Sequence, residues 1–373
     1  MKKVALISDG WKRLITYAWV DGIMKFIRES EEEIALYQYN CHGNWSKDEY
    51  HNTGEYNIYN LPKLEEFDGI IMDCINIVDK VQFQKVVDML KASKVPVISI
   101  ASDVEGFYYA GIDNKKTIAQ VMSHLIEVHH CRRFIFAGGP KENYENSLRV
   151  QSYWESLERY GFSREENPVW YGDYDFSTGE RYFKAFHKEV RQGMVNLPDV
   201  FVCANDNIAA GLIYQAQQLG YSVPQDFRVT GFDNLDKAIY FNPQITTVGL
   251  VREVIGYECM GMMADIWQGK KVPRNHFTSS NCVFTESCGC PNSGLLNYRD
   301  YAKNQMISEI GKLRNEEELI VFESEIIKYN TYDKIFHKIA EYFMSLECDG
   351  YFVVINQQLY EGDNIDAFSI EGY

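Results

Sequence analysis

The stretch from residue 199 to residue 248 constrains the fold more strongly than any other part of the sequence. An apolar run, residues 200–204, ends at Asn205-Asp206, and a helix-like stretch follows. A second short strand, expected over residues 227–231, ends at Phe232-Asp233-Asn234. Two strands joined through a helix lie parallel and are covered on both faces. Ligands of such open α/β sheets bind at the carboxyl ends of the strands, which is where these polar side chains are expected.

The same alternation of strand and helix patterns runs from the N-terminus onward. It predicts an α/β chain with two lobes, each a doubly wound parallel sheet, and with a hinge and a ligand cleft between the lobes. Residues 40–60 interrupt the pattern as a polar stretch rich in Asn, Gly and His. The expected elements are 4–8, 17–28, 33–39, 68–72, 81–94 and 95–100 in the first set, and 116–129, 133–137 and 146–160 in the second.

Length and charge limit the classes of partner. A chain of 373 residues is long enough for two or three domains. Its 37 basic and 53 acidic residues give a net charge of −16, which argues against nucleic-acid binding through this segment, because phosphate contacts need a basic face. The apolar run near Met1 is shorter than the ~7–15 residues of a signal-peptide core. No stretch approaches the ~20 apolar residues of a membrane helix. We therefore expect a cytoplasmic location and no membrane partner.

The cysteines indicate a reducing compartment. Nine of them, an odd number, are spread over apolar segments, as is typical of reduced core thiols. Cys288-Gly289-Cys290, near Cys282, is the exception. Because zinc usually takes four ligands at wider spacing, we favour a packing role there, with a metal site as the alternative. His129-His130 ends a helix and nothing in the sequence completes a ligand set. The sequence thus predicts no cofactor and no metal.

Beyond Pro291 the sequence changes character. Residues 298–329 form a long charged stretch with helical periodicity and no proline. Its apolar residues follow an a/d pattern, which predicts a short coiled coil or signalling helix over 291–330, with a helix packed on its own domain as the alternative. The pattern consists of Met306, Ile310, Leu313, Ile320 and Ile327, and Glu317 and Ser324 interrupt it. A fresh helix start at residue 331 predicts the first elements of a partial C-terminal domain over 331–373.

Four motifs, in order, resemble those of the effector-binding core of the lactose/galactose repressor family, which is itself similar to periplasmic sugar-binding proteins. The matching segments are Ala204-Asn205-Asp206, Val223-Pro224-Gln225-Asp226, Gly231-Phe232-Asp233 and Pro243 with Thr246-Thr247-Val248. The resemblance spans residues 2–287. It implies that the chain returns to the first lobe after completing the second. Residues 1–110 plus 243–290 would form one lobe and residues 111–242 the other.

The resemblance also bears on the output. Members of this family carry an N-terminal helix-turn-helix, whereas here a strand is expected from Val4 onward. Sensors of similar make-up that close with a Cys-Gly-Cys-like stretch precede diguanylate cyclase or histidine kinase domains. We therefore expect a homodimeric sensor that closes on a small polar ligand, a sugar, and passes the change to such an output. The alternative is the effector-binding part of a transcriptional regulator whose DNA-binding domain lies outside this segment.

Three polar side chains of the second lobe are candidate ligand contacts. Arg149 lies in a segment similar to the family's Ser-x-Arg pattern, and its guanidinium is a rigid fork of donors suited to vicinal hydroxyls or a carboxylate. A cation at a helix start is otherwise unfavourable. Asp233 ends a strand and could accept two hydroxyl hydrogen bonds or cap the next helix. Asn205 could bind ligand or hinge backbone, whereas Asp206 is well placed as the helix cap.

Aromatic side chains could stack on a sugar ring, because they combine an apolar face with a polar rim. The candidates are Trp11 and Tyr17 in the first lobe and Tyr174 and Phe176 in the second, with packing as the alternative for each. The family's Asn-Pro after the first strand is absent here. Asp103, which follows another strand, is a further candidate.

Catalysis is not expected. The sequence holds no Gly-x-Gly-x-x-Gly, no phosphate-binding P-loop and no Gly-x-Ser-x-Gly elbow. A sugar-modifying enzyme that uses Asp103 and Asp233 as an acid/base pair is the remote alternative.

Overall fold

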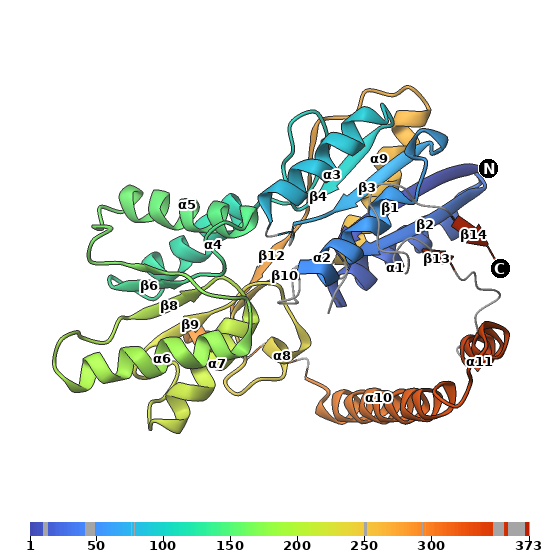
Figure 1. Ribbon diagram of the computed structural model, residues 1–373. Helices are drawn as coiled ribbons and strands as arrows, with labels where there is room; N and C mark the ends of the chain where they lie inside the picture. Colours follow the sequence, from blue (N-terminus) through green and yellow to red (C-terminus); the bar gives the residue numbers. More distant parts are fainter. Residues whose placement is uncertain are drawn as a thin grey trace. The chain divides into compact units, whose positions relative to one another are not determined.

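The computed structural model describes residues 1–9, 14–41, 49–75, 77, 79–249, 252–292, 294, 296–345, 354–356 and 370–372. The chain divides into two units, Met1–Leu296 and Asn297–Tyr373. The first unit contains two parallel sheets with helices packed around them (Figure 1). The predicted α/β architecture with two parallel-sheet lobes is therefore confirmed.

The first lobe is built on six parallel strands among the described residues, in the order β11-β5-β4-β3-β1-β2. The strands are β1 (Lys2–Asp9), β2 (Ile34–Cys41), β3 (Gly69–Asp73), β4 (Val97–Ile100), β5 (Tyr108–Ile112) and β11 (Asn275–Thr278). Inner strands are continuous apolar runs, and Val4 to Ile7 are fully buried, as a sheet covered on both faces requires. The edge strand β2 mixes polar and apolar residues and is only partly buried.

Two helices of this lobe, α1 (Leu14–Glu29) and α9 (Arg252–Trp267), pack closely against each other. A glycine stands on each helix where the backbones approach. A Cβ atom on Gly22 would lie 1.8 Å from the carbonyl oxygen of Glu253, and one on Gly256 would lie 2.0 Å from that of Trp19. The two helices can therefore approach this closely only because both positions are glycine.

The polar stretch 40–60 contains a helix, α2 (Glu49–Tyr56), and a 3₁₀ turn (Asn57–Asn60). Its burial comes from tyrosines rather than from aliphatic side chains: Tyr56 and Tyr59 are both buried. The Tyr59 hydroxyl donates to the carbonyl of Ser8 at 3.0 Å, which ties the turn to the end of β1. The remaining long helix of the lobe is α3 (Lys80–Ala92), capped by Asp79.

The second lobe has a four-stranded parallel sheet among the described residues, in the order β7-β6-β8-β9. Its elements are α4 (Asn114–Glu127), β6 (Phe134–Ala137), α5 (Tyr144–Arg159), β7 (Val169–Trp170), α6 (Phe176–Arg191), β8 (Val200–Cys203), α7 (Asp206–Gln218), β9 (Arg228–Thr230) and α8 (Asp236–Ile239). Phenylalanines fill its core: the rings of Phe183 and Phe201 lie 5.3 Å and 5.1 Å from that of Phe227. All three side chains are at most 1% exposed.

The described chain crosses between the lobes three times (Figure 1). It leaves the first lobe after β5, returns through β10 (Thr247–Gly249) before α9, and leaves again through β12 (Asn281–Val283) after β11. The last two crossings are paired, because β10 and β12 form an antiparallel ladder.

The final crossing ends on the second lobe, whereas the sequence predicts that residues 243–290 belong to the first. The 3₁₀ turn Glu286–Cys288 packs against β9, and the Ser287 hydroxyl donates to the carbonyl of Val229 at 2.6 Å. The Ser287 amide donates to Gln244 at 2.9 Å. Polar groups of a single turn thus hold the last residues of the domain on the second lobe.

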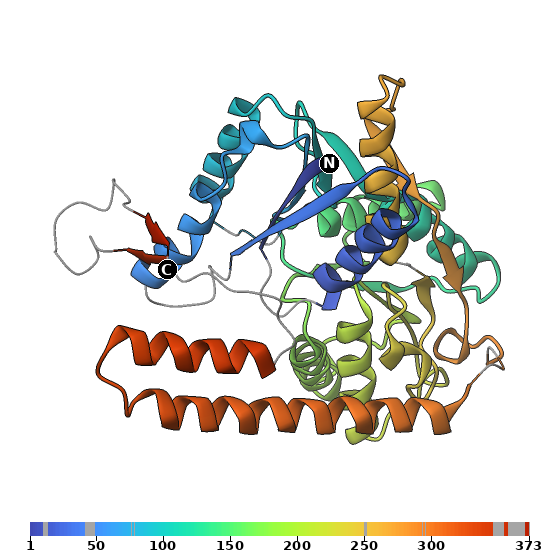
Figure 2. The ribbon, with the colours of Figure 1, turned by 90° about the vertical axis from the view of Figure 1, so that its right-hand side faces the viewer.

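The second unit contains a helical hairpin, α10 (Tyr298–Ile326) and α11 (Tyr332–Ser345), whose helices run side by side (Figure 2). The rings of Phe322 and Tyr342 stack at 4.7 Å between them. A short ladder joins β13 (Val354–Asn356) and β14 (Ile370–Gly372). Within the described part of the chain, no helix combines the length and the apolar character needed to cross a membrane.

Candidate functional site

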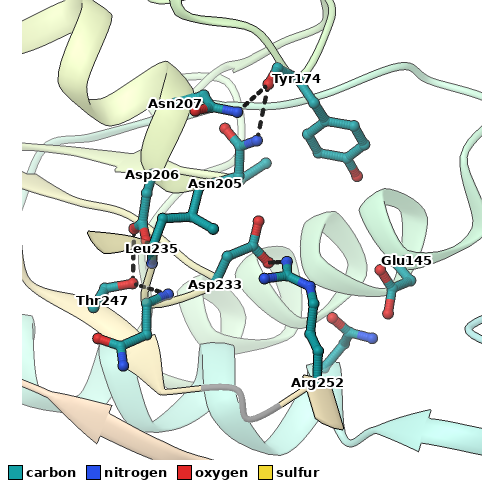
Figure 3. A network of polar contacts seen from close by, with 12 residues as sticks. Glu145, Tyr174, Asn205, Asp206, Asn207, Asp233, Leu235, Thr247 and Arg252 are labelled. Atoms are coloured by element: carbon teal, nitrogen blue, oxygen red, sulfur yellow. Dashed lines mark hydrogen bonds and ion pairs between the residues drawn. The ribbon is translucent and has the colours of Figure 1, made fainter. Parts of the chain in front are cut away.

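Polar side chains converge where β8 and β9 end, as the sequence predicts for strands of an open sheet. We call Glu145, Arg149, Asn205, Asp206, Asp233 and Arg252 the boundary network. Five of these residues come from the second lobe, and Arg252 begins α9 of the first. Figure 3 shows Asp233 facing Arg252, with Asn205 and Asp206 on the neighbouring strand end.

Asn205, rather than Asp206, caps helix α7. The Asn205 Oδ1 atom accepts from the Ile208 amide at 2.9 Å, and its Nδ2 donates to the carbonyl of Tyr174 at 3.0 Å. The sequence assigns the cap to Asp206 and leaves Asn205 open, so the structure exchanges the two roles. The reason is that Asp206 already stands inside the first helical turn, where its carboxylate points away from the helix amides. Asn205 is thereby committed to contacts within the protein.

Asp206 is fully buried and joins three segments. Its Oδ1 accepts from the Thr247 hydroxyl at 2.7 Å, and its Oδ2 accepts from the Leu235 amide at 2.8 Å (Figure 3). Burial, with a smaller contribution from the negative charge of Asp233, raises the pKa of Asp206 to about 8, although these hydrogen bonds act in the opposite direction. A carboxyl group at the start of α7 therefore ties the end of β9 to the crossing strand β10.

Arg149 lies on α5 and is only 2% exposed. Its Nε donates to Asn114 Oδ1 at 2.8 Å, and its Nη1 donates to the carbonyl of Ala204 at 2.7 Å. Nη2 lies 3.3 Å from Glu145 Oε2, and the guanidinium lies 3.8 Å from the centre of the Phe232 ring. Burial raises the pKa of Glu145, against the effect of Arg149. The sequence-predicted arginine is thus placed at the strand ends, with three protein acceptors.

Asp233 forms an ion pair that joins the lobes at the strand ends. Its Oδ1 lies 3.2 Å from Nη2 of Arg252, and both side chains are largely buried. The Asp233 backbone has φ of 102°, and Asn234 follows with φ of 52°. Such angles are costly for residues other than glycine and concentrate at functional sites. The strained turn directs the carboxylate of Asp233 toward the first lobe.

Two aromatic candidates of the second lobe have different surroundings. Tyr174 stands over Gly139 at the strand ends, and its hydroxyl donates to Asn143 Oδ1 at 3.1 Å. Phe176 instead packs between α6 and α7, with its ring 5.6 Å from that of Tyr214. The ligand role predicted for Phe176 is therefore not supported, because helix packing takes up this ring.

The first-lobe candidates do not gather at the boundary network. Asp103 pairs with Arg274 at 2.6 Å, within its own lobe. Tyr17 is 65% exposed on α1, and its stacking role stays a prediction. Trp11 lies outside the described residues.

Tyr109 of β5 is a further candidate ligand contact that the sequence pattern does not identify. Its side chain is 2% exposed, and its hydroxyl has no hydrogen-bond partner among the described residues. The ring lies 6.4 Å from that of Tyr144 on α5 of the other lobe. The sequence signal was present, since Tyr109 opens the apolar run before Asp113, but nothing in that run marks the tyrosine as different from its neighbours.

A second cluster lies away from the boundary network. His124, His129, Cys288 and Cys290 place their ligating atoms within 4.8 Å of one another. These side chains could hold a metal ion. From the sequence, we favour a packing role for the two cysteines and find no complete set of metal ligands around His129. The missing ligand is His124, which lies within an ordinary helix pattern.

The chain is similar to a known domain family and to transcriptional repressors. Residues 122–288 match the family model of a periplasmic binding protein-like domain. The transcriptional repressor CytR of Escherichia coli strain K12 is 31% identical over 164 residues, which is 43% of this chain and 46% of the relative. The repressor MelR of Bacillus subtilis strain 168 is 25% identical over 198 residues, 52% of this chain and 56% of the relative.

The chain thus spans about half the length of the curated relatives it matches. Among solved structures, the complex of the transcriptional regulator CelR with cellobiose aligns with a TM-score of 0.62 at 20% identity, covering 77% of this chain and 84% of that one. Both curated relatives are transcriptional repressors, which favours the regulator over the cyclase or kinase output. The chain therefore contains a periplasmic binding protein-like domain over residues 122–288, is similar there to transcriptional repressors, and has the two-lobed fold of its structural neighbours.

Proposed function

We propose that this chain is the effector-binding part of a transcriptional regulator and that its lobes close on a small polar ligand, a sugar or a sugar derivative, without chemical turnover. The ion pair between Asp233 and Arg252 carries the proposal. It joins the two lobes at 3.2 Å, at the carboxyl ends of the strands. A ligand bound there would contact both lobes at once, and its tighter binding to one lobe arrangement would favour that arrangement.

The chemistry of the boundary network suits a hydroxylated ligand. The carboxylate of Asp233 can accept two hydroxyl hydrogen bonds, and a guanidinium can donate two in parallel. The Tyr109 hydroxyl, buried without a described partner, offers a further polar contact from the first lobe. Tyr174 adds an aromatic face at the strand ends, and its hydroxyl already bonds to Asn143. Aromatic rings beside a few directed polar groups are typical of small-molecule sites.

The surroundings of the two acidic candidates favour binding over catalysis. Asp103 and Asp233 each pair with a different arginine, Arg274 and Arg252. A general acid or base must be free to exchange a proton with its substrate, and each of these carboxylates is already bound to an arginine. Both pairs therefore favour a binding role.

The test is thermal unfolding of the whole chain against a panel of sugars, sugar phosphates, nucleosides and amino acids. A ligand at 100 times its Kd stabilises the folded protein by ~2.7 kcal/mol, which raises the unfolding midpoint by a few degrees. The expected result is a rise with one class of sugar. The lobe angle measured by solution scattering should change with the same ligand.

Two variants localise the binding. Asp233→Asn and Arg252→Gln should abolish the rise, because each removes one partner of the ion pair. Asp236→Asn, three residues away on α8, and Arg132→Gln are matched controls, since both side chains are exposed. Loss of binding in the controls as well, or full binding in both site variants, would show that the ligand sits elsewhere.

A further inference from the structure

The second cluster brings together side chains from two distant segments. His124 lies in the last turn of α4, and His129 follows that helix directly. Cys288 ends the 3₁₀ turn that follows β12, and Cys290 comes two residues later. His124 and Cys288 are 164 residues apart in the sequence. The segment that leaves the final crossing therefore meets the C-terminal end of α4 at these four side chains.

The spacing of the four ligating atoms matches a tetrahedral site. The Nε2 atoms of His124 and His129 lie 3.1 Å apart. The Cys290 Sγ lies 3.3 Å and 3.4 Å from these two atoms, and the Cys288 Sγ lies 3.9 Å from His124 Nε2. With zinc bonds of 2.0–2.1 Å to nitrogen and about 2.3 Å to sulfur, a tetrahedron has edges of about 3.4 Å between nitrogens and about 3.6 Å between nitrogen and sulfur. These four distances lie within about 0.3 Å of the edges of such a tetrahedron. The largest separation in the group is 4.8 Å, so one side chain must move by about 1 Å to complete the site.

Local backbone geometry aims both thiols at the same point. The amides of Cys288 and Cys290 donate to the same carbonyl, that of Thr285, at 3.2 Å and 3.1 Å. Between them Gly289 takes φ of 96°, in the left-handed region that favours glycine. A Cβ atom at this position would lie 3.5 Å from His129. The Cys-Gly-Cys sequence thus folds tightly around the histidines.

Neighbouring groups hold the cluster in place. The ring of Phe284 stacks on the His124 imidazole, with centroids 3.6 Å apart and planes 15° apart. The Nε of Arg228 on β9 donates to the carbonyl of Cys288 at 2.9 Å. Positioned second-layer contacts of this kind orient the ligands of metal sites.

We propose that His124, His129, Cys288 and Cys290 bind one Zn²⁺ ion as a structural site. Two thiolates and two imidazoles in a tetrahedral arrangement are a common ligand set of structural zinc sites. All four positions are filled by protein, so no place is left for a reacting water, and the role is structural rather than catalytic. Cys288 is buried and the other three are partly exposed, which leaves a route for the ion.

The consequence concerns the end of the effector-binding domain. The ion would fasten residues 288–290 to α4, and the second unit begins at Asn297. The segment leading out of the domain would then start from a fixed point on the second lobe.

The experiment is metal analysis of the full chain purified under reducing conditions without added chelator. The expected result is one zinc per chain. Exchange with cobalt should give the visible bands of tetrahedral Co²⁺ and a thiolate-to-cobalt charge-transfer band. Cys290→Ser and His129→Gln should weaken zinc binding by more than the ~10–100-fold that loss of an outer contact causes. Both side chains are partly exposed, so the variants should fold, and circular dichroism checks this.

Cys282→Ser and His130→Asn are the matched controls. Both residues are neighbours of the cluster in sequence, and neither belongs to the four-residue group. These variants should retain one zinc and the cobalt bands. A reduced wild-type chain that takes up neither zinc nor cobalt would overturn the proposal. So would ligand variants that bind zinc as tightly as the controls do.

Discussion

At the scale of single residues, the polar groups of the boundary network satisfy one another through hydrogen bonds and ion pairs. Arg149 donates to three acceptors, Asp206 accepts from two donors, and Asp233 pairs with Arg252. Buried charges without such partners would be costly. The network is therefore stable without ligand, and a ligand must offer better contacts than the internal ones.

Asp206→Asn should change how stability depends on pH. The folded-state pKa of about 8 lies above the unfolded value near 4, so the folded protein holds the proton more tightly. The free energy of unfolding of the wild type therefore falls as the pH rises from about 4 to about 8. The asparagine can accept from Leu235 and donate to Thr247, and it does not ionise. Urea unfolding across this range should show the variant gaining on the wild type by up to ~1.4 kcal/mol per pH unit.

Asp236→Asn serves as the control for this effect, because its side chain is exposed. Its stability should follow the wild-type pH profile. A constant difference between Asp206→Asn and the wild type from pH 5 to pH 8 would contradict the raised pKa.

Arg149→Ala should be destabilising by about 3 kcal/mol, because it removes the buried member of an ion pair and leaves the partly buried Glu145 without its cation. It also removes the donor to Ala204 at the end of β8. Arg181→Ala removes an exposed arginine, 3.8 Å from Asp173, and should cost less than about 1 kcal/mol. Chemical denaturation of the two variants checks the contrast. Equal losses of unfolding free energy would contradict this prediction, because the contacts of Arg149 would then stabilise the fold no more than those of an exposed arginine.

The sequence predicts much of the second-lobe side of the site. Asn205, Asp206 and Asp233 follow directly from apolar runs, and strand ends of one sheet meet at one edge. Arg252, Tyr109 and His124 could not be predicted in this way. Each stands inside an ordinary helix or strand pattern, and only the tertiary fold brings its partner, from a segment far away in the sequence, within contact distance.

At the scale of elements, the contact between α1 and α9 is the most sharply determined. Gly22→Ala and Gly256→Ala should each lower the free energy of unfolding by about 1–3 kcal/mol or more, because the added methyl group meets a backbone carbonyl within 2.0 Å and the helices must separate. Denaturant unfolding of the whole chain measures the loss.

Gly261→Ala provides the matched control on α9. The nearest atom to its Cβ would be a ring carbon of Phe26 at 3.8 Å, which is an ordinary contact. Alanine is favoured over glycine in helices, so this variant should be stabilised by up to ~1 kcal/mol. If all three alanine variants behave alike, close packing at Gly22 and Gly256 is not what limits the substitution.

Some elements could be predicted from the sequence pattern and others could not. The alternation of strands and helices is readable because inner strands are apolar on both faces, as Val4 to Ile7 are. Helix α2 is not, because its buried side chains are tyrosines in a polar stretch. The short β10–β12 ladder is likewise invisible, since three residues per strand carry no periodic signal.

At the scale of the whole molecule, α10 has no buried residues among those described. Met306, Ile310, Leu313, Ile320 and Ile327 are all more than half exposed. An apolar stripe at a/d spacing on an exposed helix suits a second copy of the same helix. We expect the full chain to form a dimer through α10.

The double variant Ile310→Glu with Leu313→Glu should weaken this dimer, because it places like charges in the helix seam. Sedimentation equilibrium of the full chain should show a shift toward monomer. Leu319→Glu, an apolar residue of α10 outside the a/d pattern, is the control and should leave association unchanged. A wild-type chain that is monomeric at all accessible concentrations would remove the basis of this prediction.

The three crossings have a consequence for any attempt to divide the protein. A single protease cut in one crossing would not release a lobe, because two covalent connections would remain. Nor can the first lobe be expressed as an uninterrupted stretch: its edge strand β11 and helix α9 are encoded after the entire second-lobe sheet. In genetic terms the second lobe is an insertion into the first. Isolating the first lobe would require excising the insertion and rejoining the flanking ends.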